Sequence, residues 1–255
     1  MGVTIKLGKN AQESAVHYHQ LAKKLRKKAE GLEKAILETK KNIRRAEGKE
    51  RVKKEKKVRI VREKEWYESF GWSFTNSGKM ILFGRNEKQN DIVVARHMEK
   101  GDLFFHADIR GGSATILKGG VGAKREDRDF AAVIAASFSK AWVRGFSQAD
   151  AYSVEKEQLS KHSKSGGAAP AGGFMLEGKR DWHKNTELKV RVGVDEKGRA
   201  AVGAESAGWM KKSVLVVPGK KAKGETGRKI GEILGVEESE VVHVLPSGSF
   251  GLVKE

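Results

Sequence analysis

Cysteine is absent from this chain of 255 residues, and its absence excludes disulfide bonds, thiolate metal clusters and cysteine nucleophiles. Long apolar runs are also missing, because no stretch approaches the roughly 20 residues that a membrane-spanning helix needs. The opening MGVTIKLGKN has neither a secretory apolar stretch nor the Ser or Thr of a myristoylation signal. We therefore expect a cytoplasmic protein without a membrane partner, stabilised by packing.

Acidic residues are scarce relative to basic ones, with 33 Asp and Glu against 51 Lys and Arg and a net charge of +18. Hydrophobic residues still make up 38% of the chain, which is enough to fill the core of one large domain or two small ones. A field of this sign attracts polyanions, so nucleic acid is the first class of partner to consider.

Proline is missing from residues 11–65, where helix-forming residues dominate and a seam of apolar or small residues recurs in alternating steps of four and three. The seam comprises Tyr18, Ala22, Leu25, Ala29, Leu32, Ile36, Thr39, Ile43 and Ala46. So narrow a stripe predicts one strand of a coiled coil, with its second helix supplied by the same molecule or by another chain. Residues 23–65 hold 19 basic and 8 acidic side chains, which fits either a solvated coiled-coil face or a basic rod along phosphates.

After residue 65 the sequence changes to short apolar runs punctuated by glycine, which is typical of an α+β domain with a mixed β-sheet and packed helices. We expect strands near 80–83, 103–108, 114–118, 151–154, 174–176, 188–194, 200–202, 214–217, 241–244 and 251–253. Helices are expected near 86–98, 127–143 and 225–234, and residues 160–173 read as a loop. We divide the chain into a basic coiled-coil arm helix (1–65), a domain (66–205) and a small α/β C-terminal extension (206–255).

The segment FFHADIRGGSATILKGG, residues 104–120, concentrates side chains able to do chemistry. His106 and Asp108 lie two apart on an expected strand and so share a face, where they suit a metal or a proton relay. A metal needs at least one further ligand, and no HExxH motif is present. The alternative is that Asp108 caps its own glycine turn with His106 packed beside it. Gly111 offers backbone amides and Arg110 adjoins it, which favours a phosphate contact.

Two common kinds of catalytic site find no support in the sequence. Gly219 and Gly224 have the spacing of a P-loop, but the pair Glu225-Thr226 follows where Lys-Ser or Lys-Thr is required. The lysine that reaches the terminal phosphates is therefore missing. Neither a GxSxG elbow nor a paired-carboxylate motif is found. We therefore expect a binding module that is not an enzyme and uses no metal or cofactor.

Four segments in order resemble one family. WYESFGWSF at residues 66–74, then FGRNEKQND, FFHADIRGGSATI and GGFMLEGKRDW, are similar to the RNA-binding module of the NFACT proteins, which are ribosome quality-control factors. The basic helix resembles the second strand of that family's coiled-coil arm, and residues after 205 resemble an archaeal-type C-terminal extension. The resemblance implies a module that binds the large ribosomal subunit carrying peptidyl-tRNA and helps to recruit tRNA for nascent-chain tailing. Peptide-bond chemistry would belong to the ribosome.

The resemblance also implies partners. These are the rRNA of the large ribosomal subunit and tRNA. Because the family's N-terminal domain and the first helix of its arm are not in this sequence, we expect a fragment, one half of a split protein or a stand-alone relative. A separate N-terminal NFACT half and self-association through the coiled coil are then both open as further partners. The competing hypothesis is a metal-dependent RNA-processing enzyme centred on His106 and Asp108.

By matching motifs, the resemblance implies a set of RNA-binding residues: Arg85, Gln89, Asn90, His106, Asp108, Gly111 and Lys179. The first three match a Gly-Arg-x-x-x-Gln-Asn motif, and a His-Ala-Asp-x-x-Gly motif follows. Phe174, Gly178 and Lys179 match a Phe-Met-x-x-Gly-Lys strand. We add Arg110, Lys118 and Arg180 as cations that face phosphate; position 110 is often His in the family, and Arg there adds a phosphate donor. Trp142 and Trp182 either stack on unpaired bases or fill the core.

The aromatic stretch WYESFGWSF raises its own question, since aromatic residues beside a basic run suit single-stranded RNA. Trp66 and Phe70 lie one helical turn apart, and Trp72 and Phe74 alternate into a strand. That spacing favours a joint that fixes the basic helix on the domain.

Overall fold

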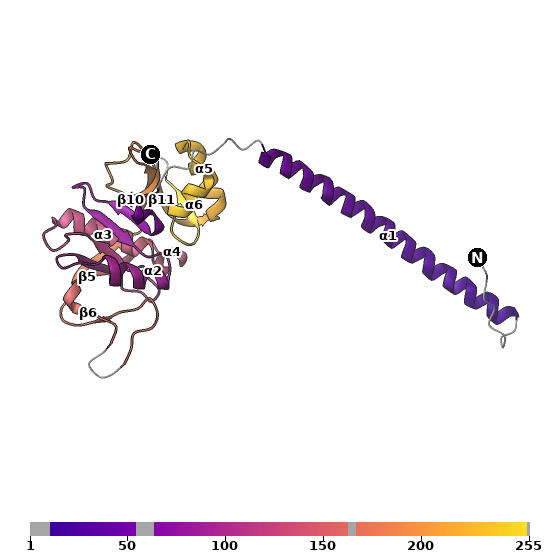
Figure 1. Ribbon diagram of the computed structural model, residues 1–255, viewed down its shortest axis with the longest axis horizontal. Coiled ribbons are helices and arrows are strands. Elements are labelled where there is room, and N and C mark those ends of the chain that lie inside the picture. The colour runs from indigo at the N-terminus through magenta and orange to yellow at the C-terminus, as the bar shows by residue number, and fades with distance from the viewer. Residues whose placement is uncertain (1–10, 55–63, 163–166, 254–255) are drawn as a thin grey trace. The chain divides into compact units, whose positions relative to one another are not determined.

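The computed structural model describes residues 11–54, 64–162 and 167–253. The chain divides into two units, Met1–Glu63 and Lys64–Glu255, each described by itself. The first unit contains α1 (Ala11–Lys54), which confirms the long helix (Figure 1). Leu25, Leu32 and Ile36 of the seam are each more than half exposed, and coiled-coil pairing remains a prediction. The end of the arm, residues 55–63, lies outside the described residues.

The second unit begins with the 3-10 turn η1 (Trp66–Ser69) and a six-stranded antiparallel sheet in the order β1-β2-β4-β3-β5-β8. The strands are β1 (Gly71–Phe74), β2 (Met80–Phe83), β3 (Leu103–Ala107), β4 (Thr115–Leu117), β5 (Gln148–Glu155) and β8 (Asp181–Glu187). Alternation along each strand sends Phe105 and Leu117 to one face, where α3 (Arg125–Ser137) packs. Phe104 and Ile116 face the other way, into a second apolar cluster.

Shorter elements fill the connections of this sheet. They are α2 (Glu87–Ile92), the π-helical η2 (Val93–His97), α4 (Lys140–Val143), η3 (Lys156–Gln158), β6 (Leu159–Ser160) and β7 (Met175–Leu176). The expected helix at 86–98 is therefore present, and the side chain of Asn86 caps it by accepting from the amide of Gln89. Strands β6 and β7 form a small hairpin around the loop.

A second sheet has the order β10-β9-β11-β12. It consists of β9 (Val190–Val194), β10 (Ala200–Ala204), β11 (Lys212–Lys221) and β12 (Phe250–Leu252), with α5 (Lys223–Leu234) and α6 (Glu238–Val244) in the connection between β11 and β12. Val214 and Val216 pair with Val192 and Val190, so the division expected after residue 205 runs through this sheet. Residues 206–255 belong to the same unit as the residues before them.

The α+β class is confirmed, and two local expectations need correction. The run Val241–Val244 is helical rather than extended, because it packs as part of α6 with Val241 fully buried. Strand β8, DWHKNTE, was not expected because its residues are mostly polar. It is the edge strand of the sheet, so most of its side chains reach solvent.

Candidate nucleic-acid interface

Three rings lie side by side across β3, β5 and β8. His106 pairs with Tyr152, and Tyr152 pairs with Trp182, with ring centroids 6.0 Å and 5.6 Å apart. Directly opposite residues of antiparallel strands share a face, which brings these rings together from distant parts of the sequence. Tyr152 is buried, whereas Trp182 keeps 36% of its surface exposed. We call His106, Tyr152 and Trp182 the aromatic ladder.

Cationic side chains cover the ladder. The guanidinium carbon of Arg180 lies 4.7 Å from the ring centroid of Tyr152 and 5.7 Å from that of Trp182. The ammonium of Lys184 lies 4.0 Å from the centroid of Trp182, on the same strand. Lys184 also donates to Asp150 at 2.7 Å, and this hydrogen bond holds the pKa of that carboxyl below its usual value. The ladder therefore combines ring faces with positive charge.

The turn after β3 adds more positive charge. Gly111 has a φ of 88°, and a Cβ at that position would lie 2.8 Å from Cε of Lys140, so the lysine stem packs over the glycine. A Cβ on Gly112 would lie 2.9 Å from Nε2 of His106, which places the turn beside the ladder. Arg110 is exposed. We call Arg110, Gly111 and Lys140 the basic turn.

His106 and Asp108 differ in their surroundings. Nδ1 of His106 donates to the carbonyl of Ala107 at 2.6 Å, and burial lowers the pKa of its imidazole, which keeps the ring neutral. Asp108 is half exposed and lies 3.9 Å from Nη1 of Arg180. Within residues 11–54, 64–162 and 167–253, no group of three His, Asp or Glu side chains is placed to hold a metal ion. The arrangement favours His106 as a ring packed against the glycine turn.

The Arg85 motif braces the chain rather than facing solvent. Nη2 of Arg85 donates to the carbonyls of Glu68, at 3.3 Å, and of Phe70, and its Nη1 contacts Nε2 of His243. Burial lowers the pKa of Arg85. Gln89 donates to the carbonyl of Ser69 at 3.0 Å and accepts from the amide of Arg85 at 3.0 Å. These contacts hold η1 against the start of α2.

Asn90 braces a second place in the fold. Its side chain is buried, accepts from the amide of Ala114 at 3.0 Å and donates to the carbonyl of Gly112 at 3.3 Å. A Cβ on Gly84 would lie 2.3 Å from Oδ1 of Asn90, so only glycine fits there. Asn90 thus fixes the far end of the glycine turn.

Lys118 has all three of its N–H donors in use. They bond the carbonyl of His97 at 2.9 Å, Glu99 at 2.8 Å and Asp102 at 2.7 Å. Burial opposes the charge of Lys118, but these bonds raise its pKa in total. Lys179 is exposed, and the preceding Gly178 has a φ of 82°. Of the two lysines expected at RNA, only Lys179 presents a solvent-facing side chain.

The two tryptophans whose roles were open differ. Trp142 is 1% exposed and donates to the carbonyl of Ser249 at 3.1 Å, so it belongs to the core. Trp182 is a member of the ladder. Phe174 packs edge to face on Phe104 at 5.5 Å, with the ammonium of Lys161 4.2 Å above its ring.

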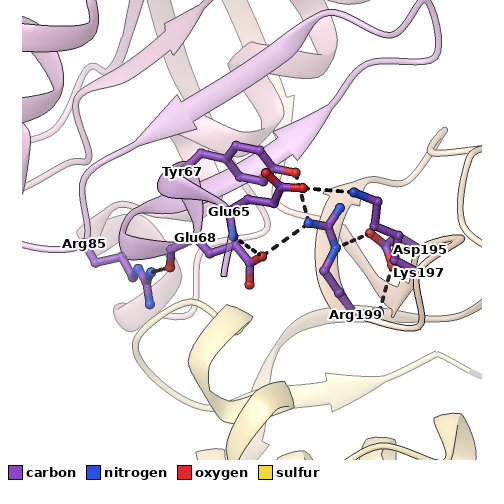
Figure 2. A network of polar contacts seen from close by, with 7 residues as sticks. All are labelled: Glu65, Tyr67, Glu68, Arg85, Asp195, Lys197 and Arg199. Atoms are coloured by element: carbon purple, nitrogen blue, oxygen red, sulfur yellow. Dashed lines mark hydrogen bonds and ion pairs between the residues drawn. The ribbon is translucent and has the colours of Figure 1, made fainter. Parts of the chain in front are cut away.

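A buried arginine holds η1 from the side of the second sheet (Figure 2). Nη1 of Arg199 donates to the hydroxyl of Tyr67 at 2.9 Å and to Glu68 at 3.3 Å. Its Nε donates to Asp195 at 2.6 Å, and together these contacts raise the pKa of Arg199. Lys197 adds an exposed ion pair with Glu65 at 2.9 Å. The segment Glu65–Phe70 is therefore fixed within the second unit by contacts from both sheets, and its role as a joint for the arm stays a prediction.

Sequence reasoning missed three residues of this surface. Tyr152 and Lys184 lie on β5 and β8, and only the strand pairing brings them to His106 and Trp182. The spacing of Trp182 and Lys184 by two residues was the available signal. Lys140 had none, because its contact with Gly111 exists only in the folded chain.

The fold and the motif order define an RNA-binding domain of the NFACT type: residues 69–178 match the family model described as "NFACT protein RNA binding domain". The chain belongs to the NFACT family. It is 35% identical over 208 residues to the archaeal Rqc2 homolog aRqcH of Methanocaldococcus jannaschii. The aligned region covers 78% of this chain and 31% of that protein.

More distant similarity extends to other relatives. The chain is 30% identical over 180 residues to the ribosome quality control complex subunit NEMF of Homo sapiens, over 68% of this chain and 16% of that protein. It therefore spans less than a third of the length of either relative. The solved C-terminal part of the fibronectin/fibrinogen-binding protein from Streptococcus suis overlaps with a TM-score of 0.40 at 26% identity, over 51% of this chain and 49% of that chain. None of the helices in the described ranges is long and apolar enough to cross a membrane.

Proposed function

We propose that this chain binds RNA through Trp182, the exposed end of the aromatic ladder, and through the basic turn, as the RNA-binding domain of a ribosome quality-control factor. The observation that carries the proposal is the exposed ring of Trp182 at the sheet edge with Arg180 and Lys184 beside it. Exposed rings with adjacent cations are what unpaired bases and their phosphates require. The family description of residues 69–178 supports the same class of ligand.

The residues expected at RNA divide into two groups under this proposal. Arg110, Gly111, Lys179 and Arg180 contact RNA, joined by Lys140, Trp182 and Lys184. Arg85, Gln89, Asn90, His106 and Lys118 support the fold, because their side chains already bond backbone groups or carboxylates of the chain itself. Asp108 positions Arg180.

The finer proposal concerns the ribosome. The chain binds the large subunit carrying peptidyl-tRNA, with rRNA and tRNA as partners, and assists tRNA recruitment while the ribosome performs any peptide-bond formation. The names of the relatives support this context, since one is a ribosome quality control complex subunit and another an Rqc2 homolog. The basic helix α1 adds positive charge to the chain, which favours RNA binding, and its coiled-coil pairing within the same molecule or with another chain stays a prediction.

Co-sedimentation with separated ribosomal subunits, with and without peptidyl-tRNA, tests the proposal. The chain is expected in the large-subunit fraction, and Trp182→Ala should lower its affinity roughly 5-fold or more, since stacking on one base contributes about 1–3 kcal/mol. Trp66→Ala removes another exposed indole and is the matched control, expected to bind like the parent chain. Binding that is indifferent to Trp182, or equal for both subunits, would contradict the proposal.

A further inference from the structure

A groove of about 320 Å³ opens where β8 begins. Ser153 and Asp181 form the last pair between β5 and β8, so β5 continues to Val154 and Glu155 without a β8 partner. The groove lies at this step in the sheet, and Leu103, Val121 and Val154 give it an apolar lining. Its volume suits a single small planar group rather than a helix or an extended peptide.

Charges of both signs line the groove. Arg128, Lys179 and Arg180 provide cations, and Glu155 and Asp181 provide carboxylates. A simple anion such as phosphate gains nothing from the two carboxylates, and an acidic peptide is repelled by them. Nη1 of Arg128 lies 3.9 Å from Asp181, so cations and carboxylates stand side by side in the groove and suit an occupant that offers both hydrogen-bond donors and a negative group.

Two residues that line the groove, Arg128 and Ser153, each hold a buried polar atom without a hydrogen-bond partner among the described residues. Nη2 of Arg128 donates to the carbonyl of Val121 at 2.6 Å, but its buried Nε has no hydrogen-bond partner among the described residues. The buried hydroxyl of Ser153 is likewise unpaired within the described part of the chain. A buried polar atom without a partner is costly, and a ligand that pairs with it recovers that cost.

We propose that this groove receives one unpaired nucleotide of the bound RNA, with the base against the apolar lining and its phosphate toward Lys179. A nucleobase has apolar faces and an edge that carries donors and acceptors, so it satisfies the carboxylates, Arg128 and Ser153 together. The inference rests on the proposed RNA binding and specifies a base-holding subsite for it.

Arg180 lies both at the groove and over the aromatic ladder. This residue borders the groove, while its guanidinium lies 4.7 Å from the ring of Tyr152 and 3.9 Å from Asp108. A single strand stacked on Trp182 therefore has a neighbouring nucleotide within reach of the groove. A duplex keeps its bases paired and cannot fill it.

The test compares a single-stranded RNA oligonucleotide with a duplex of the same sequence, by fluorescence anisotropy. Val121→Trp fills the groove from an exposed position, and Val253→Trp makes the same change at an exposed valine outside the groove lining. Val121→Trp should weaken single-strand binding roughly 5-fold or more and leave duplex binding unchanged. Lys179→Glu, at an exposed residue, should also weaken single-strand binding. It replaces Val121→Trp as the test if Val121→Trp lowers the melting temperature of the chain.

Ultraviolet crosslinking gives the direct readout. In the parent chain the crosslinked peptides should include Val121 or residues 179–181, and Val121→Trp should lose them. Single-strand affinity equal to that of Val253→Trp, together with an unaffected Lys179→Glu, would overturn the inference while leaving RNA binding intact. If the parent chain binds neither the single strand nor the duplex, the proposed function fails. Titration with adenosine monophosphate then tests the groove alone. NMR shifts of the backbone amides at residues 153–155 and 179–181 would support the base-holding subsite, and their absence would overturn it.

Discussion

Replacing Arg199 by Met removes the guanidinium at the centre of the network that fixes η1 (Figure 2). Arg199 is 6% exposed, and the side chains of its partners Asp195 and Glu68 are each only 9% exposed. Arg199→Met keeps most of the packing volume against Trp72, whose ring centroid lies 4.9 Å from the guanidinium carbon. The variant therefore isolates the loss of charge and of three hydrogen bonds.

The magnitude follows from what is left behind. Removing one member of a buried ion pair costs about 3–5 kcal/mol, because the carboxylates of Asp195 and Glu68 then stay buried without the cation that balances them. For a domain of this size, each kcal/mol lowers the melting temperature by about 2–4 °C. We expect Arg199→Met to lower the melting temperature of the second unit by roughly 10 °C.

Tryptophan fluorescence during thermal and urea unfolding of the full chain measures the effect, because all five tryptophans lie after residue 65. Lys197→Met is the control, since Lys197 makes an exposed pair with Glu65 that contributes at most about 1 kcal/mol. A loss below about 1 kcal/mol for Arg199→Met, or an equal loss for Lys197→Met, would refute the role of the buried network.

Three further outcomes are expected. Arg85→Ala should cost about 2 kcal/mol in urea unfolding because carbonyls of η1 lose a charged donor, with RNA affinity unchanged; a stable variant that binds RNA weakly would reverse its assignment. Trp66→Ala should cost about 1 kcal/mol through loss of its stack on His97 and leave RNA affinity intact, which calorimetry and RNA titration check together. The free energy of unfolding should fall as pH drops below about 6.5, because the unfolded chain then binds a proton that His106 binds less readily in the folded chain. His106→Gln should reduce this dependence of the unfolding free energy on pH, measured by urea titrations at a series of pH values. An unaltered pH dependence would count against the role of His106.

The sequence predicted strands best where a short apolar run is buried on both faces. The apolar runs of β2, β3 and β4 lie in the core of the first sheet, and these runs are visible in the sequence. Strand β8 was not predicted because an edge strand needs no apolar face. Helix α6 was not predicted because its valines favour a strand locally, while tertiary packing holds them in a helix. At α6, local propensity is overridden by packing.

The candidate site was partly visible for a related reason. Arg110, Gly111 and Arg180, all expected at RNA from the sequence, border the proposed surface, but a motif does not separate residues that support the fold from residues that contact a ligand. Arg85 and Lys118 have the charge of phosphate ligands, and only their bonds to carbonyls and carboxylates reveal their structural use. The ladder itself depends on strand register, which no single segment encodes.

Salt dependence of single-stranded RNA affinity is the most direct measurement of RNA binding at the basic turn. The logarithm of the association constant should fall steeply with the logarithm of salt concentration, by roughly 0.7 for each phosphate neutralised. The double variant Arg110→Ala with Lys140→Ala should reduce that slope by roughly 1.4, whereas the exposed pair Lys211→Ala with Lys229→Ala, outside the basic turn and the ladder, should leave it nearly unchanged. A flat salt response of the parent chain, or equal slopes for the two double variants, would contradict RNA binding at this surface.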